Sequence, residues 1–467
     1  MFVFLVSLSV YVLTLREYKF DPDILNLFTQ HALLTTGNPS LGSVSDSANQ
    51  HLTYYVDYMI SNGQYYSSYA PGLPYLSLPF GAVGFLLGGG RNSIAILADE
   101  GFVALCAALS AVVLYKVCRI YASPIPCLLA SFTLAFGTIV WPFATALFNH
   151  DVAMLFSLIG VYCVLRIAKT ENARRMKFLL IAAAGASLGI ASTLEYLSGL
   201  IFVPLFIFLA NRKKLGVLDG SLLVGTFSIG PILDLAYNQL VTGNPISFPE
   251  DLCACANGQT ALSRFDLSQL LIVPVYNLLS PYRGIFLISP VLLVGVYGLY
   301  RMYRSDRLRG DALLFLSIFL LGLFPYSAWS DWQGGGSLGP RYLIDVIPYL
   351  VIPIAFVLSE NLERGVRRKW IFLSLFVFSS LMSGAAAFTS PDPISPTTPN
   401  LFFFQPIAQS IPWLLQNNLD VWWFAYSPLL AFVIVPLCFF SVWVVTVVVA
   451  RPRPGLLTRV RESEPSR

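Results

Sequence analysis

The chain has 467 residues, of which 12% are charged and 56% are apolar, and its mean hydropathy is +0.68. Soluble domains carry about 25% charged and at most about 50% apolar residues, so this composition excludes a soluble globular protein and a disordered chain. A net charge of +4 over this length forms no basic patch, which excludes a nucleic-acid binder. The apolar stretches are continuous and do not alternate, which favours a helical membrane protein over a β-barrel.

The apolar stretches predict an all-α membrane protein that forms a single transmembrane domain over 1–467. A span needs roughly 17–25 mostly apolar residues, and about twelve stretches meet this requirement. The first stretch, 1–15, is short. We interpret it as a span and not as a cleaved signal peptide, because only Arg16-Glu17-Tyr18 follows and no small-residue cleavage site does. The remaining spans are expected at 94–115, 124–145, 149–165, 178–194, 197–210, 218–236, 284–300, 312–328, 342–358, 370–388 and 424–450.

The basic residues indicate how these spans are oriented. With a cytoplasmic N-terminus, 23 of the 29 Lys and Arg residues fall in inner loops or the tail, as the positive-inside rule requires. The long polar segments 16–93, 237–283 and 389–420 would then face outward. In the first of them, Asp23–Thr35 is predicted to form an amphipathic helix on the membrane. A second interfacial or re-entrant helix is predicted at 72–87; if it spanned, every later loop would change sides.

The cysteines carry little functional information. Most lie in or beside spans and are interpreted as packing residues. Cys253 and Cys255 face outward in a CxC pair that is too close for an easy mutual disulfide. No second pair exists to complete a zinc site, so no metal is expected there.

Charged residues at membrane depth are costly and are usually functional, so the outward-facing ionisable residues near the ends of spans are the site candidates. Asp21-Pro22-Asp23 places two carboxylates after the first span, where one could act as a general base for an acceptor hydroxyl. The alternative is a solvated loop in which Asp23 caps the following helix.

Two further candidates lie at the outer ends of spans. His150 and Asp151 open the fourth span and could orient a substrate; the alternative is a polar helix start capped by Asn149. Glu195 lies in the outer turn of a tight hairpin of spans. It needs a partner, expected to be an arginine, and a structural ion pair is as plausible as substrate contact.

Two arginines, Arg283 and Arg341, begin spans from the outside next to glycines. A cation is disfavoured at a helix N-terminus, unless helix end and guanidinium together bind an anion such as a lipid phosphate. The alternative is a snorkelling arginine at lipid headgroups. Trp329, Asp331 and Trp332 suit sugar binding, with an ordinary interfacial aromatic belt as the alternative.

These motifs resemble the polyprenyl-phosphate-sugar-dependent membrane glycosyltransferases of the GT-C fold, in the family 39-like branch of the protein O-mannosyltransferases and aminoarabinose transferases. The resemblance covers about residues 1–360. The family's acidic loop motif corresponds to Asp21-Pro22-Asp23. Its "G-x-Y-Y-x-x-Y-P-P-G-x-P" stretch is similar to residues 63–74, which include Tyr66 and Tyr69. Similar stretches also occur at 137–143, 148–151, 193–196, 280–284 and 335–342. The chain departs from the pattern where Pro22 separates the two aspartates and where Ala70 replaces a proline.

The resemblance implies transfer of a sugar from a polyprenyl-phosphate donor to an acceptor hydroxyl on the extracytoplasmic side, with inversion. Arg283 and Arg341 would bind the donor phosphate, and Asp21 or Asp23 would be the base. His150, Asp151, Glu195, Tyr66 and Tyr69 would bind or orient substrate. No cofactor is firmly implied; a divalent cation near Asp21 and Asp23 is the alternative.

The acceptor remains open and could be a lipid, a glycan or a protein. The sequence also does not specify whether the sugar is a hexose or a pentose. The protein is expected in the plasma (inner) membrane, with membrane lipids as neighbours. No nucleic-acid partner is expected. The alternative from another class is a transporter or flippase of a lipid-linked anion. It would favour discontinuous helices at the midplane and pseudo-symmetry, whereas the ionisable residues here gather at the outer ends of the predicted spans.

Overall fold

A computed structural model describes residues 1–15, 21–41, 58–88, 92–171, 173–253, 260, 262–281, 283–334, 339–361 and 366–388. Helices occur at every predicted span within these ranges, so the all-α membrane fold is confirmed. The predicted span 424–450 and the predicted outward segment 389–420 lie outside the described residues.

Six helices in the described ranges are long and apolar enough to cross a membrane. They are α5 (Asn92–Cys118), α8 (Asn149–Lys169), α9 (Arg174–Leu194), α11 (Val217–Thr242), α15 (Arg309–Ala328) and α17 (Val366–Phe388). Shorter apolar helices fill the other predicted spans in these ranges: α1 (Phe2–Leu13), α6 (Pro124–Phe136), α10 (Phe202–Asn211), α14 (Leu292–Tyr303) and α16 (Pro348–Asn361).

Several predicted spans are broken into two pieces. The stretch predicted at 124–145 divides into α6 and the short α7 (Val140–Phe143), with Gly137 after the end of α6. The stretch at 284–300 divides into α13 (Ile285–Ile288) and α14, with Pro290 between them. Proline lacks the N–H that a continuous helix needs. The 3₁₀ helix η2 (Tyr196–Ile201) likewise precedes α10. These breaks leave backbone turns close to the predicted outer ends.

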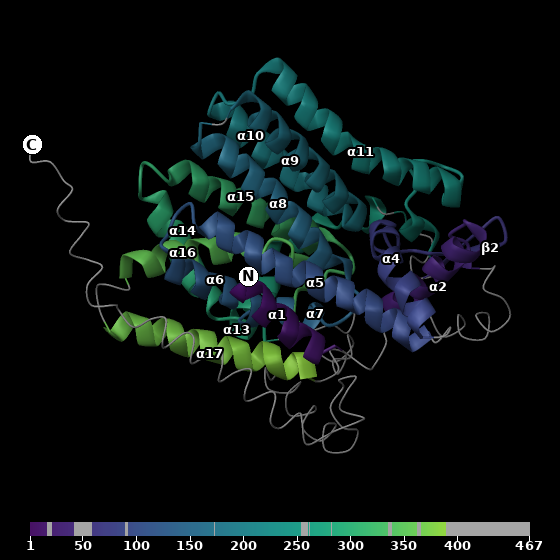
Figure 1. Cartoon of the computed structure of the whole chain (residues 1–467), viewed down its shortest axis with the longest axis horizontal. Coiled ribbons are helices and arrows are strands. Elements are labelled where there is room, and N and C mark those ends of the chain that lie inside the picture. The colour runs from purple at the N-terminus through teal and green to yellow at the C-terminus, as the bar shows by residue number, and fades with distance from the viewer. Residues whose placement is uncertain are drawn as a thin grey trace, which may run out of the picture.

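Helices α8, α9 and α11 pack side by side as the large layer in the upper part of Figure 1. The crossing of α9 and α11 depends on small residues. A Cβ added at Gly230 would lie only 2.0 Å from the carbonyl oxygen of Gly189, and Gly185 precedes Gly189 by one turn. Small residues at this spacing let membrane helices approach closely.

The short elements of the first predicted outward segment gather at one end of the bundle, on the right of Figure 1. They include α2 (Asp21–Thr36), a hairpin of β1 (Tyr58–Ser61) and β2 (Gln64–Ser67), and α4 (Gly72–Leu87). The predicted helices at 23–35 and 72–87 are therefore present. The hairpin was not predicted, although its Asn62-Gly63 turn, with positive φ at both residues, is a strong hairpin signal.

Buried polar contacts fix α2 against α4 and α5. The side-chain amide of Gln30 donates to Ser77 Oγ at 2.7 Å and to Asp99 Oδ1 at 3.2 Å. Asn26 donates to the other oxygen of Asp99 at 3.4 Å. Because Asp99 is fully buried, losing these donors would be costly, so the contacts hold α2 in one place at the mouth of the bundle.

The remaining short elements lie in the second predicted outward segment and beyond it: η3 (Pro249–Leu252), η5 (Leu262–Arg264), η6 (Leu267–Leu271), α12 (Val273–Leu279) and η7 (Arg341–Leu343). Cys253 follows η3 and is disulfide-bonded, which the sequence did not predict. Within the described ranges, four cysteines are free and buried, as expected for packing residues: Cys106, Cys118, Cys127 and Cys163.

Candidate active site

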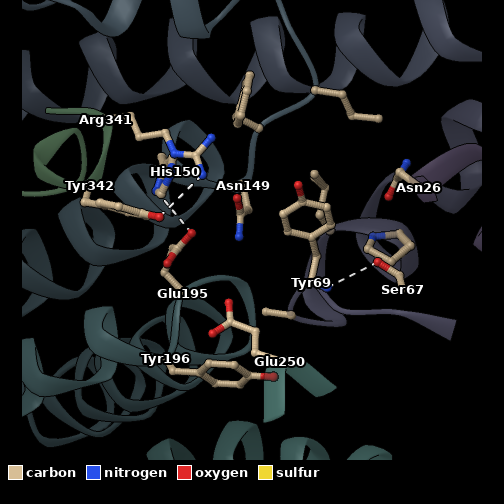
Figure 2. A pocket seen from close by; sticks show the side chains of 15 residues that line it. Asn26, Ser67, Tyr69, Asn149, His150, Glu195, Tyr196, Glu250, Arg341 and Tyr342 are labelled. Carbon is tan, nitrogen blue, oxygen red and sulfur yellow. Dashed lines mark hydrogen bonds and ion pairs between the residues drawn. The ribbon is translucent and has the colours of Figure 1, made fainter. Parts of the chain in front are cut away.

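A small polar pocket of about 90 Å³ lies between α2, the segment joining β2 to α4, the start of α8, the turn after α9, η3 and η7. Figure 2 shows its polar side chains converging from these distant parts of the sequence. It is lined by Asn26, Ser67, Tyr69, Ala70, Leu73, Pro74, Leu147, Phe148, Asn149, His150, Glu195, Tyr196, Glu250, Arg341 and Tyr342.

Arg341 is the cation of this pocket. Its Nη2 donates a long hydrogen bond of 3.4 Å to the Tyr342 hydroxyl, and its guanidinium lies 5.4 Å from the ring centre of Phe148. The Nε atom is buried without a hydrogen-bond partner, and no carboxylate of the described residues lies within ion-pair distance. A guanidinium enclosed without an ion-pair partner is costly, and an anion in the pocket would relieve that cost.

Glu195 and His150 form the acid–base pair beside Arg341. His150 Nδ1 lies 3.1 Å from Glu195 Oε1, and the Tyr326 hydroxyl donates to Glu195 Oε2 at 3.1 Å. Tyr326 stacks on Tyr342 with ring centres 4.8 Å apart. The prediction that an arginine would pair with Glu195 is wrong within the described residues, because histidine and tyrosine occupy that role.

Burial sets the protonation of this group of residues. It raises the pKa of Glu195 to about 8, an effect that the nearby Asp345 carboxylate strengthens and that the Tyr326 hydrogen bond and Arg341 oppose. Burial also raises the pKa of Asp345 to about 6, against the opposing hydrogen bond from Ser198. Glu195 is therefore mostly a neutral acid at pH 7, able both to donate and to accept a hydrogen bond.

Helix α8 begins without a side chain that caps its N-terminus, and its first turn brings His150 into the pocket. Phe148 occupies the N-cap position, and Asn149 Nδ2 donates to the Leu194 carbonyl at 2.5 Å. The interpretation of Asn149 as a helix cap is therefore wrong: its amide joins α8 to the end of α9. Asp151 is fully buried outside the pocket lining, and both of its carboxyl oxygens lack a hydrogen-bond partner among the described residues.

The structure separates the two predicted phosphate arginines. Arg283 is fully buried, does not line the pocket, and donates through Nη1 to the Gly339 carbonyl at 3.2 Å. It thereby holds the loop that leads into Arg341. Arg341 itself begins the short η7, and α16 starts only at Pro348. The prediction that Arg341 opens a long helix is therefore wrong, and the helix-dipole argument does not apply to it.

The predicted sugar-binding aromatics also separate. Tyr69 lines the pocket, whereas Tyr66 packs against Met59 and Tyr237. Trp329 lies under the guanidinium of Arg264, and Trp332 packs beside Tyr276. Trp329, Asp331 and Trp332 are thus placed outside the pocket lining, and their role in sugar binding stays a prediction.

Asp21 and Asp23 lie in the first turn of α2, and their side chains fall outside the described residues. The helix begins two residues before the predicted start at Asp23. Asn26, one turn after Asp23, lines the pocket and was missed because a single amide in a helix carries no sequence signal. In the described part of the chain, no group of three His, Cys, Asp or Glu side chains could hold a metal ion.

Other pocket residues were also missed by the sequence reasoning. Tyr342 directly follows Arg341 in the sequence, so the candidate Arg341 could have pointed to Tyr342 as a site residue. Glu250 comes from η3, far along the chain in the second predicted outward segment, and only the folded structure brings it to the pocket.

Comparisons with known proteins agree with this fold. Residues 81–227 match the family model described as dolichyl-phosphate-mannose-protein mannosyltransferase. No curated protein sequence matches the chain significantly. The structure is similar to that of ArnT from Cupriavidus metallidurans bound to undecaprenyl phosphate, with a TM-score of 0.52 and 16% identity over 82% of this chain and 62% of ArnT.

It is also similar to the oligosaccharyltransferase of Archaeoglobus fulgidus in complex with zinc and sulfate, with a TM-score of 0.55 and 13% identity over 89% of this chain and 55% of that one. The chain spans less than two thirds of the length of either structure. It therefore has the GT-C fold of these membrane glycosyltransferases, with residues 81–227 matching the dolichyl-phosphate-mannose-protein mannosyltransferase family.

Proposed function

We propose that the protein transfers a sugar from a polyprenyl-phosphate-linked donor to an acceptor hydroxyl on the extracytoplasmic face of the membrane, with inversion at the sugar carbon. The observation that carries this proposal is Arg341, a guanidinium in the polar pocket without a carboxylate partner in the described chain. Two similar structures support it: one is ArnT bound to undecaprenyl phosphate, and the other is the Archaeoglobus fulgidus oligosaccharyltransferase tethered with an acceptor peptide.

Arg341 and Tyr342 would hold the donor phosphate. The guanidinium offers paired N–H donors to phosphate oxygens. Burial raises the pKa of Tyr342 to about 12, although Arg341 opposes the shift, so its phenol remains a neutral donor beside the guanidinium. As the bond from the sugar carbon to the phosphate oxygen breaks, negative charge builds on the phosphate, and these fixed donors would stabilise it. Arg283 would act indirectly, by holding Gly339 ahead of Arg341.

The acceptor oxygen would attack the sugar carbon as the polyprenyl phosphate leaves. Asp21, with Asp23 as the second choice, would take the acceptor proton. Helix α2, fixed by Gln30 and Asn26 on Asp99, would carry this base toward the pocket that Asn26 lines. Glu195 and His150 would orient the acceptor from the opposite wall, and Asp151 would lie behind them.

The test uses protein reconstituted in membranes with a radiolabelled polyprenyl-phosphate sugar. Asp21→Asn should abolish transfer while donor binding stays at the wild-type level, because the amide cannot accept the proton. Asp306→Asn, whose side chain is 94% exposed, is the matched control and should transfer normally.

Normal transfer by both Asp21→Asn and Asp23→Asn would overturn the base assignment. Movement of intact donor across the bilayer without cleavage of the sugar–phosphate bond would instead support a flippase.

A further inference from the structure

A second, larger cavity lies between α4, α9 and α11. This groove has a volume of about 550 Å³ and shares no lining residue with the polar pocket. Its walls are mainly apolar and include Tyr75, Leu76, Ile190, Ile229, Leu233 and Leu240. We call it the α4–α11 groove.

The surroundings of this groove indicate what kind of molecule fills it. Helix α11 exposes apolar side chains along its length, including Ile229 at 55% and Leu233 at 58%. Since α11 is long and apolar enough to cross a membrane, these exposed side chains contact lipid chains and not water. A hydrocarbon chain is therefore the occupant with direct access to the groove.

One acid interrupts the apolar lining. Asp234 lines the groove, is 6% exposed, and has one carboxyl oxygen buried without a hydrogen-bond partner. No hydrogen bond or ion pair joins its side chain to the described residues. Asp234 lies eight residues before the end of α11, about 12 Å along the helix. An unpaired acid at such a position is costly and usually marks a functional site, and it calls for a hydrogen-bond donor or a cation.

The groove and the polar pocket are neighbours. Thr193 lines the groove, and Glu195 and Tyr196 line the pocket from the same turn after α9. The two cavities are separated where α4 meets α9: a Cβ at Gly72 would lie 2.6 Å from the Thr193 carbonyl oxygen.

We propose that the α4–α11 groove binds the hydrocarbon chain of a lipid acceptor whose hydroxyl- or amine-bearing head group donates to Asp234. The inference rests on the proposed function and names its acceptor class. The side-chain chemistry separates donor from acceptor: the Asp234 oxygens accept hydrogen bonds from a hydroxyl or an amine and offer no cation to a lipid phosphate, whereas Arg341 attracts one at the other wall of the pocket. The head group would reach the pocket past Tyr196, and the sugar would meet it there.

The test is photolabelling of wild-type protein in lipid nanodiscs. The probes are a long-chain alcohol, the corresponding amine and the corresponding phosphate monoester, each with a diazirine in the chain. Mass spectrometry locates the labelled peptides. The alcohol and the amine should label α4, α9 and α11, and the phosphate ester should label these peptides about tenfold less, a difference of about 1.4 kcal/mol.

Two variants keep the test specific. Leu233→Trp fills the groove and should reduce labelling by the alcohol about tenfold, whereas Ile232→Trp, 60% exposed on the same helix and outside the lining, should label normally. Asp234→Asn should remove the discrimination against the phosphate ester and keep labelling by the alcohol.

Equal labelling by the phosphate ester, or unchanged labelling of Leu233→Trp, would overturn the proposal. The labelling does not require sugar transfer, and donor binding at Arg341 is measured separately. A failure of the acceptor groove is therefore distinct from a failure of the transferase proposal.

Discussion

The two ends of helix α8 bury charge in opposite ways. At its C-terminal end, the fully buried Asp311 pairs with both Lys169 and Arg212, the latter at 2.7 Å. At its N-terminal end, Asp151 lacks a hydrogen-bond partner within the described chain, and Arg341 nearby has no described carboxylate within ion-pair distance. His150, in the first turn of α8, and Lys169, its last residue, are 19 residues apart, roughly 28 Å along the helix.

This difference separates structural charge from functional charge. A buried acid held by two cations has its desolvation cost offset within the protein, so the cluster at Asp311 ties α8, α10 and α15 together. The charges at the other end lower the stability of the empty protein. Their presence makes physical sense when a ligand supplies the missing partner, as an anion would for Arg341.

The largest effect on stability is expected from Asp311→Ala. Removing the acid leaves Lys169 and Arg212 without their partner, which should lower the free energy of unfolding by about 3–5 kcal/mol. Denaturant unfolding in detergent measures it. Asp306→Ala, which breaks only an exposed pair with Arg309, should change stability by less than about 0.5 kcal/mol. Equal effects of the two substitutions would remove the structural role of the Asp311 cluster.

The reverse outcome is expected at the other end for Arg341→Met. Removing an uncompensated guanidinium should leave the melting temperature unchanged or raise it, while donor affinity falls at least about tenfold. Titration with polyprenyl phosphate and thermal unfolding measure the two quantities. Arg301→Met, which disrupts a pair with Glu360 away from the pocket, is the control for affinity. A lower melting temperature with normal donor affinity would contradict the functional interpretation of Arg341.

Arg283 should behave differently from Arg341, although both arginines look alike in the sequence. Arg283→Met removes a fully buried donor from the Gly339 carbonyl, so it should lower the melting temperature, as losing a buried charged hydrogen bond costs about 1.5–3 kcal/mol. Donor affinity should fall less than in Arg341→Met. A normal melting temperature combined with the loss of donor binding would show that Arg283 contacts the phosphate directly.

A further effect on stability is expected from the pH dependence of Glu195. Its pKa is raised from 4.5 to about 8 in the folded protein, so the folded state binds a proton that the unfolded state releases. Stability from this group is present below pH 4.5 and is lost as the pH rises through 8. The melting temperature of wild type should therefore fall more between pH 5 and pH 8.5 than that of Glu195→Gln. Parallel curves would show that Glu195 is not the titrating group.

The sequence predicted where apolar helices occur, because hydropathy is a local signal. Six of the described helices are long and apolar enough to cross a membrane, and about twelve spans stay a prediction. The sequence predicted the helices at 72–87 and at Asp23–Thr35, because amphipathic or apolar stretches bounded by turns are local signals. It missed how Pro290 and Gly137 break two spans, and it placed Arg341 at a long helix that starts only at Pro348. A break in a helix leaves backbone N–H and C=O groups without their helical partners. Whether other parts of the fold can satisfy these groups is not a local property of the sequence.

Among the site residues, the sequence by itself determined which ionisable groups lie close to the predicted outer ends of the spans, because charge is excluded from the apolar stretches. Only the tertiary structure decided which of them meet. It brought His150, Glu195, Tyr69 and Arg341 into one pocket and left Arg283 behind it. It also set Asp234 in a groove between three helices. The physical reason is that hydropathy is a property of each segment, whereas a pocket arises from packing between segments distant in sequence.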